Sequence, residues 1–368
     1  MRETAPAEVI IGVDTHKDVH AAVAINTLGA HLGTKAIPAS SKGYQALETW
    51  AMSLGPIRAV GIEGTGSYGA GLSRFLRERG HAVFEVNRSN RQLRRQKGKS
   101  DTIDAEGAAR AVLGGQATAL PKSGTNAVEM IRHLKVARDT AVKARTQAMQ
   151  TLKAIIVSAP AALREQLDRV TGKMALVRRL AALRPGPITS TTASAKTSLR
   201  AISRRWLALD AEIKEHDSQL EVLTAARAPK LVEAHGMAAG TAAEMLSLVG
   251  DNPERIRSEA AFAKLCGACP IPASSGKTNR HRLNRGGNRQ ANAALHRVVV
   301  VRMRGHQPTL DYVRRRTGRC CTDPTGGARS WAGVAGRPLT CPPGCPSVPF
   351  KLNQDRRHHS PRQKRKVI

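Results

Sequence analysis

Residues 9–14 read Val-Ile-Ile-Gly-Val-Asp, and this stretch decides the fold of the N-terminal part of the chain. A short apolar run of this kind is typical of a buried β-strand, here with Asp14 at its end. A second run, residues 59–62, ends on Glu63 in the same way. A carboxylate at a strand end is usually a turn residue. Two of them at neighbouring strand ends, however, could share a functional site.

The residues around these two runs alternate between strand and helix patterns. The predicted elements are strands near 9–14, 19–26 and 31–37, a helix over 42–54, a strand over 57–63, a helix over 68–79 and a strand over 81–86. Three strands followed by alternating helices and strands is the order of an RNase H-like fold, whose first and fourth strands lie side by side. The sequence therefore predicts an α/β domain over residues 9–120 that places Asp14 beside Glu63.

Two further carboxylates, Asp101 and Asp104, stand at the start of an Ala-rich stretch that predicts a helix. Three positions apart on a helix, they share a face, although an Asp at a helix start is often only an N-cap. Mg²⁺ and Mn²⁺ prefer oxygen ligands, so we expect these two residues and the two strand-end carboxylates to hold such an ion. His16 and His20 are expected to be structural, because imidazole suits Mg²⁺ poorly.

The charge of the chain points to a polyanionic partner. Its 368 residues include 59 Lys and Arg against 28 Asp and Glu, a formal net charge of +31. Such an excess favours a phosphate backbone, and with only three Trp, three Tyr and four Phe the binding should depend little on base stacking. Because no run of about 18 apolar residues occurs, we expect a cytoplasmic protein.

Residues 124–227 are rich in Ala, Leu, Arg and Lys and predict a helical coiled-coil connector. Apolar and small residues recur at spacings of three and four along a predicted seam: Met130, Leu134, Ala137, Ala141, Ala144, Ala148, Thr151 and Ile155. An extended arm is the favoured interpretation, because a second long helix follows a break at residues 184–187. A hairpin folded back at that break fits the same pattern.

Residues 228–317 predict a second compact, mainly helical unit. Two serines, Ser274 and Ser275, precede a glycine and a basic run, as a nucleophile among phosphate ligands would; a flexible Ser/Gly loop would look similar. The five basic residues expected to bind nucleic acid are Lys277, Arg280, Arg282, Arg285 and Arg289. Cys266 and Cys269, together with Cys341 and Cys345, could hold zinc, but small buried thiols would serve equally well in the apolar surroundings of the first pair.

Residues 318–368 predict a disordered basic tail, with ten Lys or Arg, two Asp and no Glu. The change of character after Thr317 is abrupt. We hypothesise that a frameshift replaced an original helical C-terminus, which normal codon usage in the coding DNA would refute.

Five motifs along the chain form one pattern. They are Gly-Val-Asp-Thr-His-Lys at 12–17, Gly-Ile-Glu-Gly-Thr-Gly-Ser-Tyr at 61–68, Lys-Ser-Asp-Thr-Ile-Asp-Ala at 99–105, Pro-Ile-Pro-Ala-Ser-Ser-Gly at 270–276 and Arg-Gly-Gly-Asn at 285–288. Each motif is weak alone, but their order and spacing are specific. Over residues 9–317 the sequence resembles the DEDD insertion-sequence transposases of the insertion-sequence-110 type.

The resemblance implies a RuvC-like N-terminal domain, a coiled-coil connector and a C-terminal transposase domain with a nucleophilic serine. By motif, Asp14, Glu63, Asp101 and Asp104 match the Mg²⁺ ligands, and Ser275 matches the nucleophile, with Ser274 as the alternative. The family's chemistry is strand exchange through a phosphoserine link to DNA.

The resemblance also implies partners. In this family a structured RNA bridges donor and target DNA, and dimers pair into tetramers in which two subunits contribute to each site. The tail departs from the family, whose members usually continue with helical sequence.

Two other interpretations compete with a recombinase. One is a RuvC-like hydrolytic nuclease or junction resolvase, which would leave nicked DNA and no covalent adduct. The other is a non-catalytic basic RNA-binding protein, in which the carboxylates are incidental.

Overall fold

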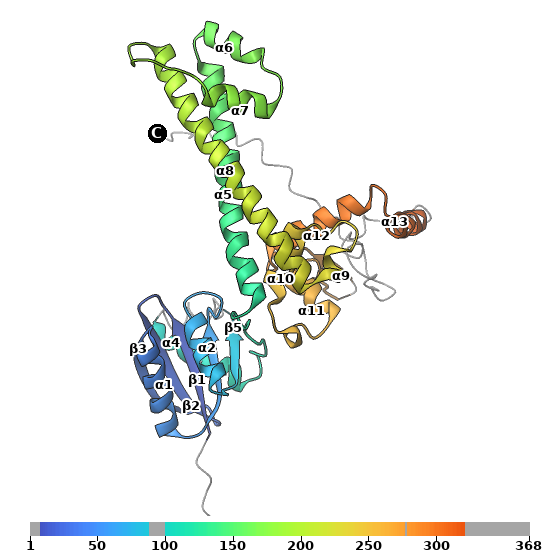
Figure 1. Ribbon diagram of the computed structural model, residues 1–368. Helices are drawn as coiled ribbons and strands as arrows, with labels where there is room; N and C mark the ends of the chain where they lie inside the picture. Colours follow the sequence, from blue (N-terminus) through green and yellow to red (C-terminus); the bar gives the residue numbers. More distant parts are fainter. Residues whose placement is uncertain (1–7, 88–99, 277, 321–368) are drawn as a thin grey trace, which may run out of the picture. The chain divides into compact units, whose positions relative to one another are not determined.

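The computed structural model describes residues 8–87, 100–276 and 278–320, and the chain forms two compact units (Figure 1). The first contains the described residues up to Leu223 together with the segment Val249–Arg255. The second contains Thr224–Leu248 and the described residues from Ile256 onward. Each unit is described below by itself.

A five-stranded mixed sheet forms the base of the first unit. Its strands are β1 (Val9–Thr15), β2 (Val19–Asn26), β3 (His31–Pro38), β4 (Ile57–Glu63) and β5 (Val83–Val86), in the spatial order β3-β2-β1-β4-β5. The first three strands are antiparallel neighbours, whereas β4 lies parallel to both β1 and β5. The predicted strands are confirmed to within two residues at each end. The predicted adjacency of the first and fourth strands is also confirmed.

Helices cover both faces of this sheet. Helices α1 (Ser41–Leu54) and α2 (Ala70–Glu78) pack on the face that carries Val9, Ile11 and Val13. Helix α4 (Asp101–Leu113) packs on the opposite face, where Ala105 and Ala109 join Ile10 in one apolar cluster. The continuous burial of β1 follows from this sandwich, because side chains of both faces are covered.

Glycines on the two central strands let α4 approach the sheet closely. A Cβ atom added to Gly12 would lie 2.0 Å from the Ala105 carbonyl oxygen and 2.3 Å from the Ala109 nitrogen. A Cβ added to Gly61 on β4 would lie 2.9 Å from the Ala108 carbonyl oxygen. The helix backbone therefore rests directly on the strand backbone at these two neighbouring positions.

A long antiparallel helical hairpin follows in the same unit, except for the last four residues of its second helix, which belong to the second unit. Its two long helices are α5 (Ala127–Ser158) and α8 (Thr191–Arg227), joined through the short helices α6 (Ala161–Asp168) and α7 (Lys173–Ala181). Figure 1 shows α5 and α8 side by side, with α6 and α7 at the turn. The favoured interpretation of an extended arm is therefore wrong in one respect, because the two long helices fold back on each other.

Ion pairs between the two helices fix their register: Arg138 pairs with Asp217, and Arg145 with Asp210. Near the turn, α5 packs through Leu152 against Trp206 of α8 in a shared apolar cluster.

The seam predicted on α5 is partly wrong. Its members Ala141 and Ala148 are buried, but Met130 is 52% exposed and Thr151 is also exposed. The buried positions at the two ends of the helix are one residue further along, at Ile131, Leu152 and Ile156. The physical reason is that charged residues, including Arg138 and Arg145, occupy part of the interface between the helices, so hydrophobic spacing alone misplaces the buried face.

The second unit is mainly helical. Its elements are α9 (Pro229–Val232), α10 (Ala239–Val249, whose last residue belongs to the first unit), α11 (Glu259–Leu265), β6 (Ile271–Pro272), β7 (His281–Arg282), α12 (Arg289–Arg302) and α13 (Gln307–Cys320). Its core joins Met245 and Leu248 to Cys266, Ala291 and Ala294.

Cys266 serves packing in this core. It is fully buried, and burial raises the pKa of its thiol to about 11. Cys341 and Cys345, the other two residues of the zinc alternative, lie outside the described residues, as does the predicted tail beyond Cys320. Within the described parts of the chain, no helix has both the length and the apolar character of a membrane span.

The contact of α4 with Gly12 predicts a large effect of a single methyl group. Gly12→Ala should destabilise the first unit by about 3 kcal/mol, because the added carbon overlaps backbone atoms that cannot rotate away. Gly66→Ala is the matched control, since a Cβ there meets no atom within 4 Å. Thermal unfolding of both variants checks this. Equal midpoints for the two variants would contradict the close contact.

Candidate functional site

The central strands bring two of the predicted carboxylates to neighbouring positions. The parallel register pairs Gly12 with Gly61 and Val13 with Ile62, so Asp14 and Glu63 occupy the next positions on adjacent strands. Side chains alternate along a strand, which places Asp14 on the same face as Gly12, and Glu63 on the same face as Gly61. That face is the one covered by α4.

Helix α4 brings the other two carboxylates to the same edge. Its backbone touches the sheet at Ala105 and Ala108, and Asp101 and Asp104 stand one turn earlier on the same faces of the helix. Ser100 begins the helix as its N-cap, with its hydroxyl oxygen accepting a hydrogen bond from the Ile103 N–H at 3.2 Å. The start of α4 is thereby fixed beside the strand ends.

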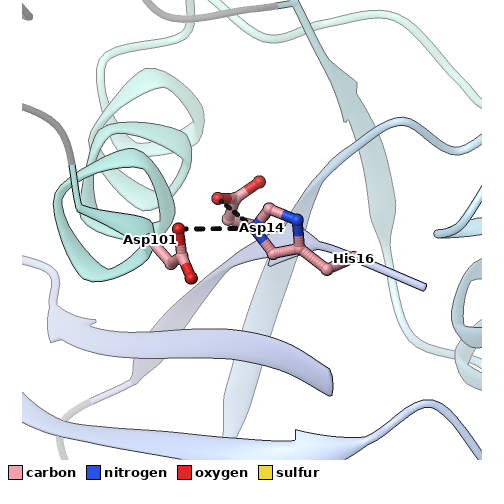
Figure 2. Close-up of side chains that lie close together, drawn as sticks. All are labelled: Asp14, His16 and Asp101. Atoms are coloured by element: carbon pink, nitrogen blue, oxygen red, sulfur yellow. Dashed lines mark ion pairs between the residues drawn. The ribbon is translucent and has the colours of Figure 1, made fainter. Parts of the chain in front are cut away.

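Three side chains meet there at distances suitable for a metal ion. His16 Nε2 lies 3.3 Å from Asp14 Oδ2 and 3.3 Å from Asp101 Oδ1, as Figure 2 shows. One ligand atom from each of the three residues lies within 4.8 Å of the other two. Asp14 is buried, whereas His16 and Asp101 are exposed.

Asp104 and Glu63 lie outside this three-residue cluster. Asp104 is buried, and its charge acts on Asp14. Glu63 lies at the end of β4, where its main-chain carbonyl accepts a hydrogen bond of 2.8 Å from the Thr15 hydroxyl. The structure thus clusters two of the four predicted carboxylates, and places Asp104 on the same helix as Asp101 and Glu63 on the strand next to that of Asp14.

His16 is the residue that the sequence interpretation set aside. The expectation that it is structural rested on the weak affinity of imidazole for Mg²⁺. Its position two residues after Asp14 is the signal that could have identified it, because residues at i and i+2 of an extended segment share a face. His20, in contrast, is fully buried, stacks on Tyr44 with ring centroids 5.9 Å apart and accepts a hydrogen bond from the His16 N–H.

The electrostatics of Asp14 are those of a crowded carboxylate. Burial raises the pKa of Asp14, the nearby charges of Asp104 and Asp101 raise it further, and His16 opposes this shift. A divalent cation would offset both the cost of burying the Asp14 charge and the repulsion between the carboxylates. The donor set therefore fits a hard divalent metal ion held by carboxylate oxygens, with an imidazole beside them.

The second unit presents the two predicted serines on a short hairpin. Strands β6 and β7 pair antiparallel, and Ala273 N–H donates to the Arg280 carbonyl at 2.8 Å. Ser275 and Thr278 exchange two backbone hydrogen bonds of 3.1 Å, which closes a tight turn. Gly276 adopts a φ of +54° in this turn, a conformation that side chains disfavour.

The two serine hydroxyls differ in their hydrogen bonds. Ser274 Oγ accepts from the Arg280 N–H at 3.2 Å and donates to the Arg280 carbonyl at 3.3 Å. The Ser275 side chain is exposed, and its hydroxyl has no hydrogen-bond partner among the described residues. Ser275 is therefore the more available of the two for reaction.

The predicted basic residues surround this hairpin in sequence. The side chains of Arg280, Arg282, Arg285 and Arg289 are all exposed. None of the four forms an ion pair with any residue that the structure describes. Lys277, the fifth predicted residue, lies outside the described residues.

Comparisons with known proteins agree with both units. A family model for transposases of the DEDD type matches residues 11–159, and a model described as the transposase IS116/IS110/IS902 family matches residues 228–314. No curated protein matches the chain. The chain is thus a DNA transposase, an enzyme of DNA recombination. It belongs to the insertion-sequence-110 family of transposases.

The carboxylate cluster predicts a measurable effect of divalent ions on stability. At a hundredfold excess over Kd, Mn²⁺ or Mg²⁺ should raise the free energy of unfolding of the first unit by about 2.7 kcal/mol, and its thermal midpoint with it. Asp14→Asn should abolish most of this increase, because it removes the buried charge. The control is Asp18→Asn, an exposed carboxylate four residues away that should retain it. Equal metal-dependent shifts in both variants would argue against the cluster.

Proposed function

We propose that this transposase cleaves and rejoins DNA through a serine nucleophile, with a divalent metal ion held by its N-terminal carboxylates. The observation that carries the proposal is the convergence of Asp14 and Asp101 at one edge of the sheet. Asp104 lies on the same helix as Asp101, and Glu63 ends the strand beside that of Asp14. Carboxylates brought close together repel one another, so their arrangement is better explained by function.

An RNase H-like, RuvC-like fold is proposed for residues 9–120. The support is the strand order β3-β2-β1-β4-β5, in which the first three strands are antiparallel and β4 and β5 continue parallel to β1. The proposed division continues with a connector over 124–227, a transposase domain over 228–317 and a basic tail over 318–368. The hairpin of α5 and α8 and the separate core of the second unit support this division.

Asp14, Glu63, Asp101 and Asp104 are proposed to hold Mg²⁺ or Mn²⁺. When bound, such an ion neutralises charge on the scissile phosphate and stabilises the oxygens that attack and leave. Before it binds, these residues hold a concentrated negative charge against the strongly basic background of the chain. His16 bridges Asp14 and Asp101 and keeps their side chains oriented toward one another.

Ser275 is proposed as the nucleophile. Its oxygen attacks the phosphorus, a serine–phosphate bond forms, one phosphate–DNA bond breaks, and the serine proton is balanced by the hydroxyl of the released DNA end. Reversal with a different DNA end rejoins the strand and restores the serine. The energy of the broken bond is retained in the phosphoserine, so no external energy source is needed.

Ser275 is preferred to Ser274 because of the hydrogen bonds around each. The Ser274 hydroxyl is occupied in both roles by the Arg280 backbone, so its oxygen would have to leave the hairpin ladder before it could react. The exposed hydroxyl of Ser275 needs no such rearrangement.

The basic residues Lys277, Arg280, Arg282, Arg285 and Arg289 are proposed to bind the phosphates of the nucleic acid. Support comes from the exposure of the four arginines and from their lack of carboxylate partners in the described part of the chain. A structured guide RNA and a homodimer that pairs into a tetramer complete the proposal. Both rest on the family resemblance; the net charge of +31 favours a polyanion and does not distinguish RNA from DNA.

The nucleophile is tested by trapping. Incubation with labelled DNA, guide RNA and Mg²⁺ should give a covalent protein–DNA adduct in the wild type and in Ser274→Ala. Ser275→Ala should give none, because the exposed hydroxyl proposed as the nucleophile is lost. Free nicked DNA without any adduct would instead indicate a RuvC-like hydrolytic nuclease or junction resolvase.

The phosphate contacts are tested by the salt dependence of binding. Replacing Arg280 and Arg282 together with Ala should weaken nucleic-acid binding and reduce the slope of log K against log salt by about 2, one unit for each lost phosphate contact. Arg257→Ala, an exposed arginine flanked by Glu254 and Glu259, is the control and should leave the slope unchanged. The same slope in the double variant and the control would exclude these phosphate contacts.

A further inference from the structure

A seven-residue segment of the second half of the chain is built into the first unit. Residues Val249–Arg255 belong to the first unit, although the residues on either side, up to Leu248 and from Ile256, belong to the second. We call this segment the strap. The chain therefore leaves the second unit, docks on the first and returns within seven residues.

Asn252 is the centre of the docking. Its side chain is 7% exposed, and its amide nitrogen donates to the Pro121 carbonyl at 3.1 Å while its amide oxygen accepts from the Ser123 N–H at 3.2 Å. Both partners lie in the loop between α4 and α5, called the α4–α5 loop below. One side chain thus satisfies two backbone groups of a segment about 130 positions earlier in the sequence.

Asp251 caps a helix that it does not belong to. The residue before α5, Asn126, occupies the N-cap position but makes no capping hydrogen bond with its side chain. Asp251 Oδ1 instead accepts a hydrogen bond of 3.4 Å from the Val128 N–H in the first turn of α5. A carboxylate there also interacts favourably with the positive end of the helix dipole.

Arg255 ties the end of the strap to the sheet. Its guanidinium donates to the Leu120 carbonyl at 3.0 Å and lies 3.6 Å from the carboxylate of Glu85 on β5. Glu85 N–H in turn donates to the Ala119 carbonyl at 2.7 Å. The strap, the α4–α5 loop and the edge strand β5 are therefore joined to one another by hydrogen bonds and an ion pair.

We propose that the strap couples the serine-bearing unit to the carboxylate-bearing unit, with Asn252 and Asp251 as its positioning residues. This rests on the proposed function, because Ser275 belongs to the second unit and the metal ligands to the first. The strap acts by holding the α4–α5 loop and the start of α5 in one conformation, while the chain on either side of it continues into α10 and α11.

The contacts are tested in the full-length protein by hydrogen exchange. Asn252→Ala should accelerate exchange of the Ser123 amide at least tenfold, and Asp251→Ala should do the same at Val128, because each amide loses its acceptor. Asp251→Asn keeps an oxygen acceptor and should restore most of the protection at Val128. Asn126→Ala is the matched control, since that neighbouring side chain caps nothing, and exchange should not change.

Coupling is tested by function and by distance. At a temperature well below unfolding, Asn252→Ala should form the Ser275–DNA adduct at least tenfold more slowly, with metal-induced stabilisation and DNA affinity unchanged. Spin labels at the exposed positions Ser53 and Ala293, one in each unit, should give a broader distance distribution in Asn252→Ala than in the wild type or Asn126→Ala.

The outcomes separate the strap from the proposed chemistry. Unchanged amide exchange or an unchanged distance distribution in Asn252→Ala would overturn the coupling. A purely structural role would slow adduct formation only in proportion to the loss of folded protein. If the wild type forms no adduct, the serine chemistry fails, and the label distances still decide whether the strap couples the units.

Discussion

The contact between the α4 backbone and two glycines is the constraint on which the candidate metal centre depends. Gly12 and Gly61 lie side by side on β1 and β4, and each admits a backbone atom of α4 where a Cβ would stand. This sets the height and the direction of the helix over the sheet. Since the strand ends and the helix start are fixed by the same contact, Asp14 and Asp101 meet without any attraction between them.

The two halves of the proposed chemistry place opposite demands on their surroundings. Asp14 is buried and crowded, and burial raises the pKa of its carboxyl. Ser275 is exposed on a tight hairpin, while the hydroxyl of its neighbour Ser274 is hydrogen-bonded to the Arg280 backbone. A rigid, layered unit supplies the first environment and a small turn supplies the second, which explains why the chain builds them from different kinds of structure.

Sequence patterns predicted the parts of the structure that depend on local periodicity. The strands around Asp14 and Glu63 and their adjacency follow from short apolar runs and element order. The reversal of α5 and α8 could not be chosen over an extended arm, because both place the same residues on helices. The ion pairs and the strap join residues at least 65 positions apart, and no periodicity reports such contacts. The contact of His16 with Asp101 was not predicted, because it joins residues 85 positions apart and depends on where α4 begins.

The charged seam of the hairpin has a mechanical consequence. Arg138 and Arg145 are seven residues apart on α5, and their partners Asp217 and Asp210 are seven apart on α8. Sliding one helix past the other by a single turn would break both ion pairs between the helices at once, so slippage is opposed. With 32 residues at 1.5 Å each, α5 is roughly 48 Å long. The hairpin thus has a fixed length, which keeps α6 and α7 at a constant distance from the strap docked at the start of α5.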